Sequence, residues 1–471
     1  MKICLTSLTF YGGVNEIGGN KILLQDKDTK IFLDFGKGFT RLGNYFEQFL
    51  APRSSNGILD FITMGLVPDI PGIYRDDLMF RAGREIKEPE VDAVLISHAH
   101  ADHVDYASFL HRDIPLYMGQ TTQNMIKAIQ ERSAGAIDRE ILEFKLAGAK
   151  RGDPKIQRTI NTFRTGKKFN IGSLEIEPIH VDHSIPGAYG FIIHTSKGPI
   201  VYTGDLRRHG AKPQMTEEFI AKAKEIKPIA LIAEGTRIKD KSTNESEQIV
   251  YSESDKLTAN SKNLVFADFN FKDVDRVQTF FNIAKKNGRK LVIKIKDAYF
   301  LKHLSSDTAL NLPNWDDEHI AIYKAKYRSG TYSDSDYFGE DRVFATAPNA
   351  LTAAEIASKP DKYICAIGFF SFNALIDMKP QAGAIYIHSA SEAYNEEQVL
   401  STKRLKNWID RFQMEHHQIH CSGHAKGEDL MEMVKDIDSD VLFPVHTEYP
   451  TEYARVTNKI NVVELNQKYE I

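Results

Sequence analysis

The stretch "SHAHADHVDY", residues 97–106, holds three histidines and two aspartates within ten positions. It follows directly on the apolar run "VDAVLI", which is typical of a buried strand. His98 and His100 lie two residues apart, so in an extended segment their side chains project to the same side and can share one metal ion. Asp102 and His103 come after a turn and can face a second ion. The stretch therefore predicts metal binding at the end of a strand.

Similar side chains follow other apolar runs, as they must if two ions are to be held. "LEIEPIHVDH" carries His180 and His183, which their spacing alone does not separate. "PIVYTGD" ends in Asp205, a carboxylate that could bridge both ions, and His446 follows "VLFPV". Alone, each histidine is more often an ordinary hydrogen-bonded residue. Together these strand ends predict a binuclear metal site.

Length and composition narrow the class of protein. A chain of 471 residues exceeds the usual limit of one hydrophobic core, so two domains, or one domain with a large insertion, are expected. Cys4, Cys365 and Cys421 lie far apart, which argues against a disulfide framework or a thiolate metal site and indicates a reducing, cytoplasmic location. No apolar stretch approaches transmembrane length, so no membrane partner is expected.

Strand-like and helix-like runs alternate along the chain, which predicts an α/β protein. Residues 21–36 predict two strands joined by the polar turn "DKDT", and residues 120–147 predict a helix. Residues 37–77 are aromatic and punctuated by Pro and Gly, which suits a lid or an interface insertion. A second α/β block, from 240 to about 415, interrupts the first.

The order of the motifs "HAHADH", "HSIPGAYG", "TGD" and "PVH" resembles that of the metallo-β-lactamase fold. "AEGT" with Glu234, "HCSGHA" with His424 and "PVHTEY" with His446 resemble motifs A, B and C of the β-CASP nucleases. The early "GGVNEIGGN" is most similar to ribonuclease J. The resemblance also implies that the small C-terminal domain of ribonuclease J is absent from this chain.

The resemblance implies a fold of two parts. Residues 1–239 and 416–471 would form the metallo-β-lactamase domain, an αββα sandwich. Residues 240–415 would form an inserted α/β β-CASP domain.

The resemblance also divides the candidate ligands between two divalent ions, Zn²⁺ or Mn²⁺. It implies one ion held by His98, His100 and His183, the other held by Asp102, His103 and His446, and Asp205 between them. His183 is preferred to His180 because it matches the "HSIP" motif. Asp34 would support the histidine loop without binding a metal itself.

The activity implied is hydrolysis of RNA phosphodiester bonds, as a 5′-to-3′ exonuclease, an endonuclease or both. A metal-bridged hydroxide would attack phosphorus, with Asp102 among the catalytic residues. His424 would then protonate the leaving oxygen while Glu234 holds it. His420 and Ser422 would contact a 5′-monophosphate on single-stranded RNA.

Charge adds weak support for a polyanion. The formal net charge is −4, but residues 145–168 and 285–303 are locally basic, although such runs are usually solvated faces. Two alternatives stay open: a metallohydrolase of the same fold acting on a small thioester, lactone or phosphodiester, and a catalytically idle RNA-binding relative. A homodimer is one option for the assembly.

Overall fold

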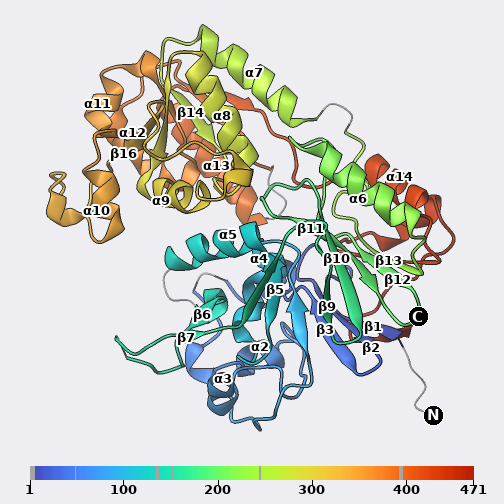
Figure 1. Cartoon of the computed structure of the whole chain (residues 1–471). Coiled ribbons are helices and arrows are strands. Elements are labelled where there is room, and N and C mark those ends of the chain that lie inside the picture. Colours follow the sequence, from blue (N-terminus) through green and yellow to red (C-terminus); the bar gives the residue numbers. More distant parts are fainter. Residues whose placement is uncertain (1–5, 48, 134–136, 151, 243–244, 392–395) are drawn as a thin grey trace. The chain divides into compact units, whose positions relative to one another are not determined.

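The computed structural model describes residues 6–471 except 48, 134–136, 151, 243–244 and 392–395 (Figure 1). The chain forms two compact units. The first unit comprises residues 1–208, 212–242 and 423–471, and the second comprises residues 209–211 and 243–422.

The borders of the second unit differ from those expected. Besides residues 209–211, it has one long segment that runs from 243 to 422, where 240 to 415 were expected. His420 and Ser422 therefore belong to the second unit and not to the resumed first domain. The reason is packing, because Ile419 and Cys421 are buried in the hydrophobic core of the second unit.

Two sheets make up the centre of the first unit. In spatial order, the first sheet consists of β22 (Lys468–Glu470), β1 (Thr6–Gly12), β2 (Lys21–Asp26), β3 (Thr29–Leu33), β4 (Ala93–Leu95), β5 (Leu116–Gly119) and β8 (Ile160–Phe163). The second sheet consists of β21 (Val441–Val445), β13 (Ala230–Glu234), β12 (Pro199–Tyr202), β11 (Tyr189–His194), β10 (Leu174–His180) and β9 (Phe169–Ile171).

Side chains alternate between two cores along the strands of the second sheet. In β11, Phe191 and Ile193 point to the core between the sheets, while Ile192 joins the core under α6 (Pro213–Glu225) and α14 (Gly427–Ile437). On the other side, α5 (Gln120–Glu131) packs against β5 and β8 (Figure 1). This arrangement of helix, two sheets and helix is the αββα sandwich that the family resemblance implies.

Residues 37–77 are more regular than expected. They form the short helices α1 (Phe39–Gly43) and α2 (Leu59–Thr63) and a 3₁₀ turn (Ser54–Asn56), followed by α3 (Asp76–Arg81). Phe61 in α2 packs on Phe109, with ring centroids 4.7 Å apart. The second half of the segment is therefore part of the first unit's core, whereas Phe49, in the first half, is 87% exposed.

The helix expected over 120–147 is shorter than predicted. α5 ends at Glu131, and the chain continues through a 3₁₀ turn (Ile137–Arg139) into β6 (Glu143–Phe144), which pairs with β7 (Ile156–Gln157). The side-chain oxygen of Gln130 accepts hydrogen bonds from the backbone N–H groups of Ile141 and Leu142. This contact turns the chain back toward the helix.

The second unit contains a parallel sheet. In spatial order its strands are β17 (Ala350–Leu351), β16 (Ile320–Tyr323), β15 (Lys290–Lys294), β18 (Tyr363–Cys365), β14 (Val265–Asp268), β19 (Ile385–His388) and β20 (Glu415–Gln418). The accompanying helices are α7 (Glu247–Asn260), α8 (Val274–Lys286), α9 (Ile295–Leu304), α10 (Glu340–Ala345), α11 (Ala353–Ala357), α12 (Asn373–Met378) and α13 (Glu396–Arg411).

The insertion leaves the first unit's sheet continuous. β13 precedes the second unit and β21 follows it, yet the two strands are parallel neighbours, with Ala230 opposite Val441. Among the described residues, no helix is both long and apolar enough to cross a bilayer.

Candidate metal centre

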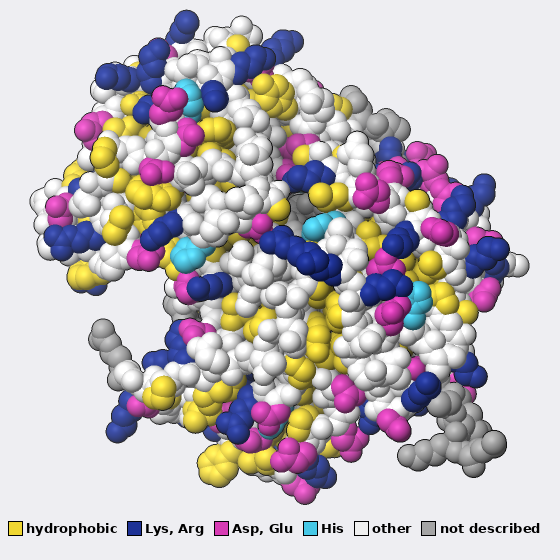
Figure 2. All heavy atoms as spheres, in the orientation of Figure 1, with side chains coloured by type: hydrophobic (Ala, Val, Ile, Leu, Met, Phe, Trp, Pro, Cys, Tyr) yellow, Lys and Arg dark blue, Asp and Glu magenta, His cyan; other side chains and the backbone are white. Residues whose placement is uncertain are grey.

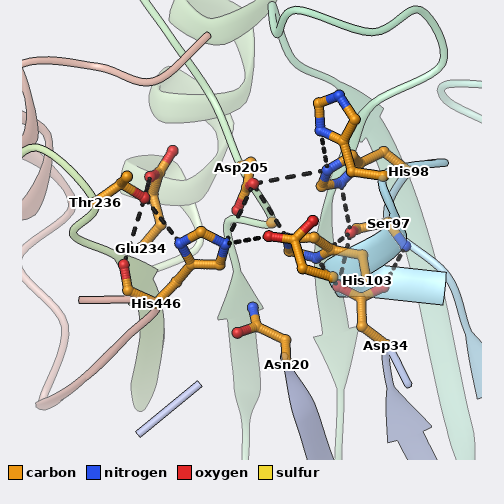
Figure 3. Close-up of polar contacts among 12 residues, drawn as sticks. Asn20, Asp34, Ser97, His98, His103, Asp205, Glu234, Thr236 and His446 are labelled. Atoms are coloured by element: carbon orange, nitrogen blue, oxygen red, sulfur yellow. Dashed lines mark hydrogen bonds and ion pairs between the residues drawn. The ribbon is translucent and has the colours of Figure 1, made fainter. Parts of the chain in front are cut away.

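The candidate ligands converge because several strands of the second sheet run in the same direction. β12, β13 and β21 are parallel, so their carboxyl ends lie at one edge. Asp205 and His446 follow two of these ends, and Glu234 is the last residue of β13. The loop after β4 brings α4 (Ala101–Val104) and the histidines to the same place (Figure 3).

Two groups of four side chains meet there, and both include Asp205. The ligand atoms within each group lie within 4.8 Å of one another. The groups are His98, His100, His183 and Asp205, and Asp102, His103, Asp205 and His446. In the first, His100 Nδ1 lies 3.1 Å from His98 Nε2 and 3.0 Å from His183 Nε2. In the second, His103 Nε2 lies 3.1 Å from Asp205 Oδ2.

The residues fit a pair of divalent cations. Imidazole nitrogens and carboxylate oxygens without thiolates suit zinc or manganese. Asp205 Oδ1 is buried and makes no hydrogen bond among the described residues. Burial also lowers the pKa of His98 and of His183, which favours the neutral ring that binds metal.

Asp34 lies behind the histidine loop. Its carboxylate accepts hydrogen bonds from the Ser97 N–H (2.7 Å), the Tyr202 hydroxyl (2.6 Å) and, at 2.7 Å, His103 Nδ1. His103 Nε2 is thereby left toward Asp205. Asp34 and His446 both adopt a left-handed backbone, with φ of 57° and 54°, which is costly for residues other than glycine.

The structure separates His183 from His180. His183 Nδ1 lies 2.6 Å from the carbonyl oxygen of Gly423, a group that can only accept, so His183 donates there and its Nε2 faces the cluster. His180 ends β10, and its ring packs against Tyr189 with centroids 4.2 Å apart. His180 is absent from both four-residue groups of described residues.

Gly36 allows the histidine loop to lie close to the end of β3. A Cβ atom on Gly36 would lie 1.7 Å from the carbonyl oxygen of Asp102. On either side, the Phe35 N–H donates to His103 O and the Lys37 N–H donates to Ala101 O. The contact leaves no room for a side chain at position 36, which the sequence analysis did not single out.

Glu234 and His424 form a hydrogen-bonded pair next to the ligands. His424 Nδ1 lies 2.8 Å from Glu234 Oε2 and 3.9 Å from Asp205 Oδ2. Burial lowers the pKa of His424, but the carboxylates of Glu234 and Asp205 outweigh it and raise that pKa to about 9. The Leu206 N–H donates to Glu234 Oε1 at 2.7 Å. Asp205, Glu234 and His424 also form a group of three whose ligand atoms lie within 4.8 Å of one another, but the raised pKa of His424 favours a protonated ring, which does not bind metal.

His420 and Ser422 have acidic neighbours within the second unit. The Ser422 N–H donates to the Glu245 carboxylate. His420 Nδ1 lies 3.4 Å from the Arg276 guanidinium, which pairs with Glu247. Burial and Arg276 lower the pKa of His420 to about 4, so its ring is neutral at physiological pH. A neutral His420 and the Glu245 carboxylate next to Ser422 give less electrostatic support for binding a phosphate than the motif suggests.

Some of the basic side chains in the two stretches are engaged by other parts of the chain. In 145–168, Arg158 is buried and donates to the carbonyls of Ser108 and His111. In 285–303, Lys286 pairs with Asp255. Basic and acidic side chains are interspersed over the face shown in Figure 2. These stretches are thus weaker support for polyanion binding than their composition suggests.

Three polar residues of the centre were missed by the sequence analysis. Ser97, Tyr202 and Thr236 hydrogen-bond to the carboxylates of Asp34 and Glu234, which contact the histidines. Ser97 and Thr236 are drawn in Figure 3. Each lies inside a stretch quoted above, but hydroxyl residues are common near strand ends, and no spacing marks these three.

Two family models match the chain. Residues 68–243 match the Beta-lactamase superfamily domain. Residues 409–461 match the Zn-dependent metallo-hydrolase RNA specificity domain. The first match contains the histidine loop, His183 and Asp205, and the second contains His424 and His446.

Similar proteins include several named ribonuclease J. That of Sinorhizobium meliloti is 21% identical over 81% of this chain and 62% of its own length. That of Helicobacter pylori (strain 26695) is 21% identical over 94% of this chain and 56% of its own. That of Pyrococcus abyssi is 22% identical, over 97% and 94%. The chain thus spans less than two thirds of the first two relatives.

A solved structure has the same fold. It is a crystal structure of a protein of unknown function from Enterococcus faecalis V583, with a TM-score of 0.77 and 22% sequence identity. The match covers 99% of this chain and 100% of that one.

Proposed function

We propose that this chain, a ribonuclease J-like protein of the metallo-β-lactamase fold, is a metal-dependent hydrolase that cleaves RNA phosphodiester bonds. The observation that carries the proposal is the pair of four-residue groups that share Asp205. A site for two ions that share one carboxylate suits in-line displacement at phosphorus. The RNA specificity domain matched at 409–461 favours RNA as the substrate.

The side chains of the two four-residue groups would position two divalent cations. When bound, two divalent cations lower the pKa of a water molecule and neutralise charge on the phosphoryl oxygens. Residues 98, 100, 102, 103, 183, 205 and 446 would hold them. Asp34, through His103, keeps one of these rings oriented.

His424 is proposed as the general acid. Its pKa of about 9 keeps the ring protonated at neutral pH, and its 2.8 Å contact with Glu234 holds it beside the ligands. The ring would donate its proton to the leaving oxygen, and Glu234 would stabilise the charged ring before transfer.

The test uses single-stranded RNA with a 5′-monophosphate and a label at the 3′ end, with Zn²⁺ or Mn²⁺ added. Wild-type protein should cleave it. His424→Ala should lower kcat roughly 10²- to 10⁴-fold, the contribution of a general acid. His424 belongs to the group of three with Asp205 and Glu234 but to neither four-residue group, so the variant should keep the metal that the four-residue groups hold.

The products would also settle the finer proposals. Shortening from the 5′ end would favour an exonuclease, and internal cuts an endonuclease. The 5′-monophosphate contact at His420 and Ser422, the homodimer and the cytoplasmic location stay predictions. Intact RNA in the presence of bound metal would contradict the proposed function and favour a small substrate of the same fold.

A further inference from the structure

Thr236 lies between the two halves of the site. Its Oγ1 is 2.7 Å from Glu234 Oε2, on the proton-donor side, and 2.8 Å from His446 Nδ1, on the metal side (Figure 3). The same oxygen is also 3.4 Å from the carbonyl oxygen of His446. The side chain is partly buried, two residues beyond the end of β13.

The direction of these hydrogen bonds follows from the groups involved. An ionised carboxylate can only accept, and a hydroxyl has one proton. The carboxylate at 2.7 Å is closer than the carbonyl and is charged, so Thr236 donates to Glu234. The lone pair of the hydroxyl then accepts from His446, which must carry its proton on Nδ1.

This arrangement determines which nitrogen of His446 can bind a metal. With the proton on Nδ1, the lone pair is on Nε2. His446 Nε2 lies 3.2 Å from Asp102 Oδ2 and 3.6 Å from Asp205 Oδ2, so it points at the other candidate ligands. Removing the hydroxyl would allow the other tautomer and a rotated ring.

The same hydroxyl also orients Glu234. It bonds Oε2, the oxygen that contacts His424 Nδ1, while the Leu206 N–H holds Oε1. A change at Thr236 should therefore reach both the metal and the proposed acid.

A second hydroxyl in the site has the same pattern. Ser97 Oγ lies 2.7 Å from Asp34 Oδ2 and 3.0 Å from His98 Nδ1. By the same reasoning, His98 donates to Ser97, Ser97 donates to Asp34, and His98 Nε2 is left for a metal. In both places a hydroxyl stands between a ligand imidazole and a buried carboxylate.

We infer that Thr236 is a positioning residue whose hydroxyl couples the metal ligand His446 to the Glu234–His424 proton donor. The inference deepens the proposed function and rests on it for the role of His424. The expected effect of Thr236 on metal affinity depends only on His446 being a metal ligand. This part of the inference and the proposed function can therefore fail separately.

The test compares Thr236→Val, which keeps the shape but loses the hydroxyl, with Thr236→Ser, which keeps the hydroxyl. Zn²⁺ affinity is measured by competition with a chromophoric chelator, without RNA. Turnover of labelled RNA is measured separately for kcat and KM. Thr236→Val should raise the Zn²⁺ dissociation constant of one site about 10- to 100-fold and lower kcat with little change in KM. Thr236→Ser should restore both values toward wild type.

Thr6→Val is the matched control. The Thr6 hydroxyl also donates to a carboxylate, Asp26, at 2.7 Å, but at the opposite end of β1 from the metal centre. This variant should lose stability while keeping wild-type Zn²⁺ affinity. Thr236→Ala repeats the measurement without a second methyl group, in case the valine variant does not fold.

Two results would overturn the inference. One is a Thr236→Val protein with wild-type Zn²⁺ affinity and kcat. The other is an equal loss in Thr236→Ser, which would assign the effect to the methyl group and not to the hydroxyl. Failure of wild-type protein to cleave RNA would instead overturn the proposed function, and the Zn²⁺ measurements would still test Thr236.

Discussion

Four buried histidines of the metal centre each have one ring nitrogen engaged by a non-ligand group. The partners are Ser97 for His98, Asp34 for His103, Gly423 for His183 and Thr236 for His446. Such contacts select the tautomer and hold the ring, so the second nitrogen is presented to a metal. The orientation and tautomer of these four rings therefore depend on the partner groups as much as on the other metal ligands.

Substitutions of His183 and His180 provide a matched comparison of metal binding. His183→Ala removes one member of the first four-residue group and should lower bound metal from two ions toward one per chain. His180→Ala removes a histidine three residues away that is outside both groups, and it should retain wild-type metal content. Metal analysis of the purified proteins measures this directly. Equal losses in both variants would contradict the assignment.

His420 predicts a pH dependence of stability. Its pKa is about 4 in the folded chain against 6.5 ordinarily, so on acidification the unfolded chain takes up the proton first. Stability from this group is therefore complete above pH 6.5 and is lost as the pH falls toward 4. Between pH 7 and pH 4.5, His420→Gln should lose about 2 kcal/mol less than wild type. Urea unfolding at both pH values tests this, and identical losses would refute it.

At the scale of elements, close backbone contact places the histidine loop against the end of β3. Residues 35 and 37 hydrogen-bond to the loop while Gly36 faces the Asp102 carbonyl. Parallel β12, β13 and β21 then bring Asp205, Glu234 and His446 to the same edge. Strand direction and loop contact together assemble the centre from distant segments.

Gly36→Ala tests this contact. The added Cβ would meet backbone atoms and not a flexible side chain, so the loop must shift. We expect a loss of about 3 kcal/mol or more in stability and reduced metal binding at Asp102 and His103. Gly43→Ala is the control, because a Cβ there meets nothing within 4 Å. Unfolding curves and metal content should separate the two variants, and a wild-type-like Gly36→Ala would argue against the contact.

At the scale of the whole molecule, the candidate ligands all belong to the first unit, whereas both tryptophans, Trp315 and Trp408, belong to the second. A metal ion that binds only the folded state stabilises it by about 2.7 kcal/mol when the free ion concentration is a hundred times the dissociation constant. Metal should therefore stabilise the first unit directly, and tryptophan fluorescence reports on the second.

Metal removal should distinguish the two units. EDTA should lower the temperature at which the first unit unfolds, measured by calorimetry, because the centre joins segments from both of its sheets. Fluorescence-detected unfolding of the second unit should change less. Asp205→Asn, which removes the carboxylate shared by both groups, should abolish the response to EDTA. An equal shift by both methods would mean that the units unfold together.

Local pattern was sufficient for much of the fold. The strands at 21–26, 29–33, 174–180 and 441–445 were predicted because alternation and polar turns are encoded by neighbouring residues. The helix predicted over 120–147 was too long, because the end of α5 depends on Gln130 bonding to residues 141 and 142. The border at 422 depends on side-chain packing in a core that no local pattern describes.

The sequence by itself determined that histidines and carboxylates end several buried strands in the order of the metallo-β-lactamase fold, because residue type and strand position are local properties. The resemblance implied His183 rather than His180 as a ligand and Asp205 between the ions, although residue spacing alone did not. Only the tertiary structure decided which of these side chains lie within a few ångströms of one another and that Thr236 links two motifs 210 residues apart. These choices depend on distances of a few ångströms between segments far apart in the chain, which one-dimensional spacing does not contain.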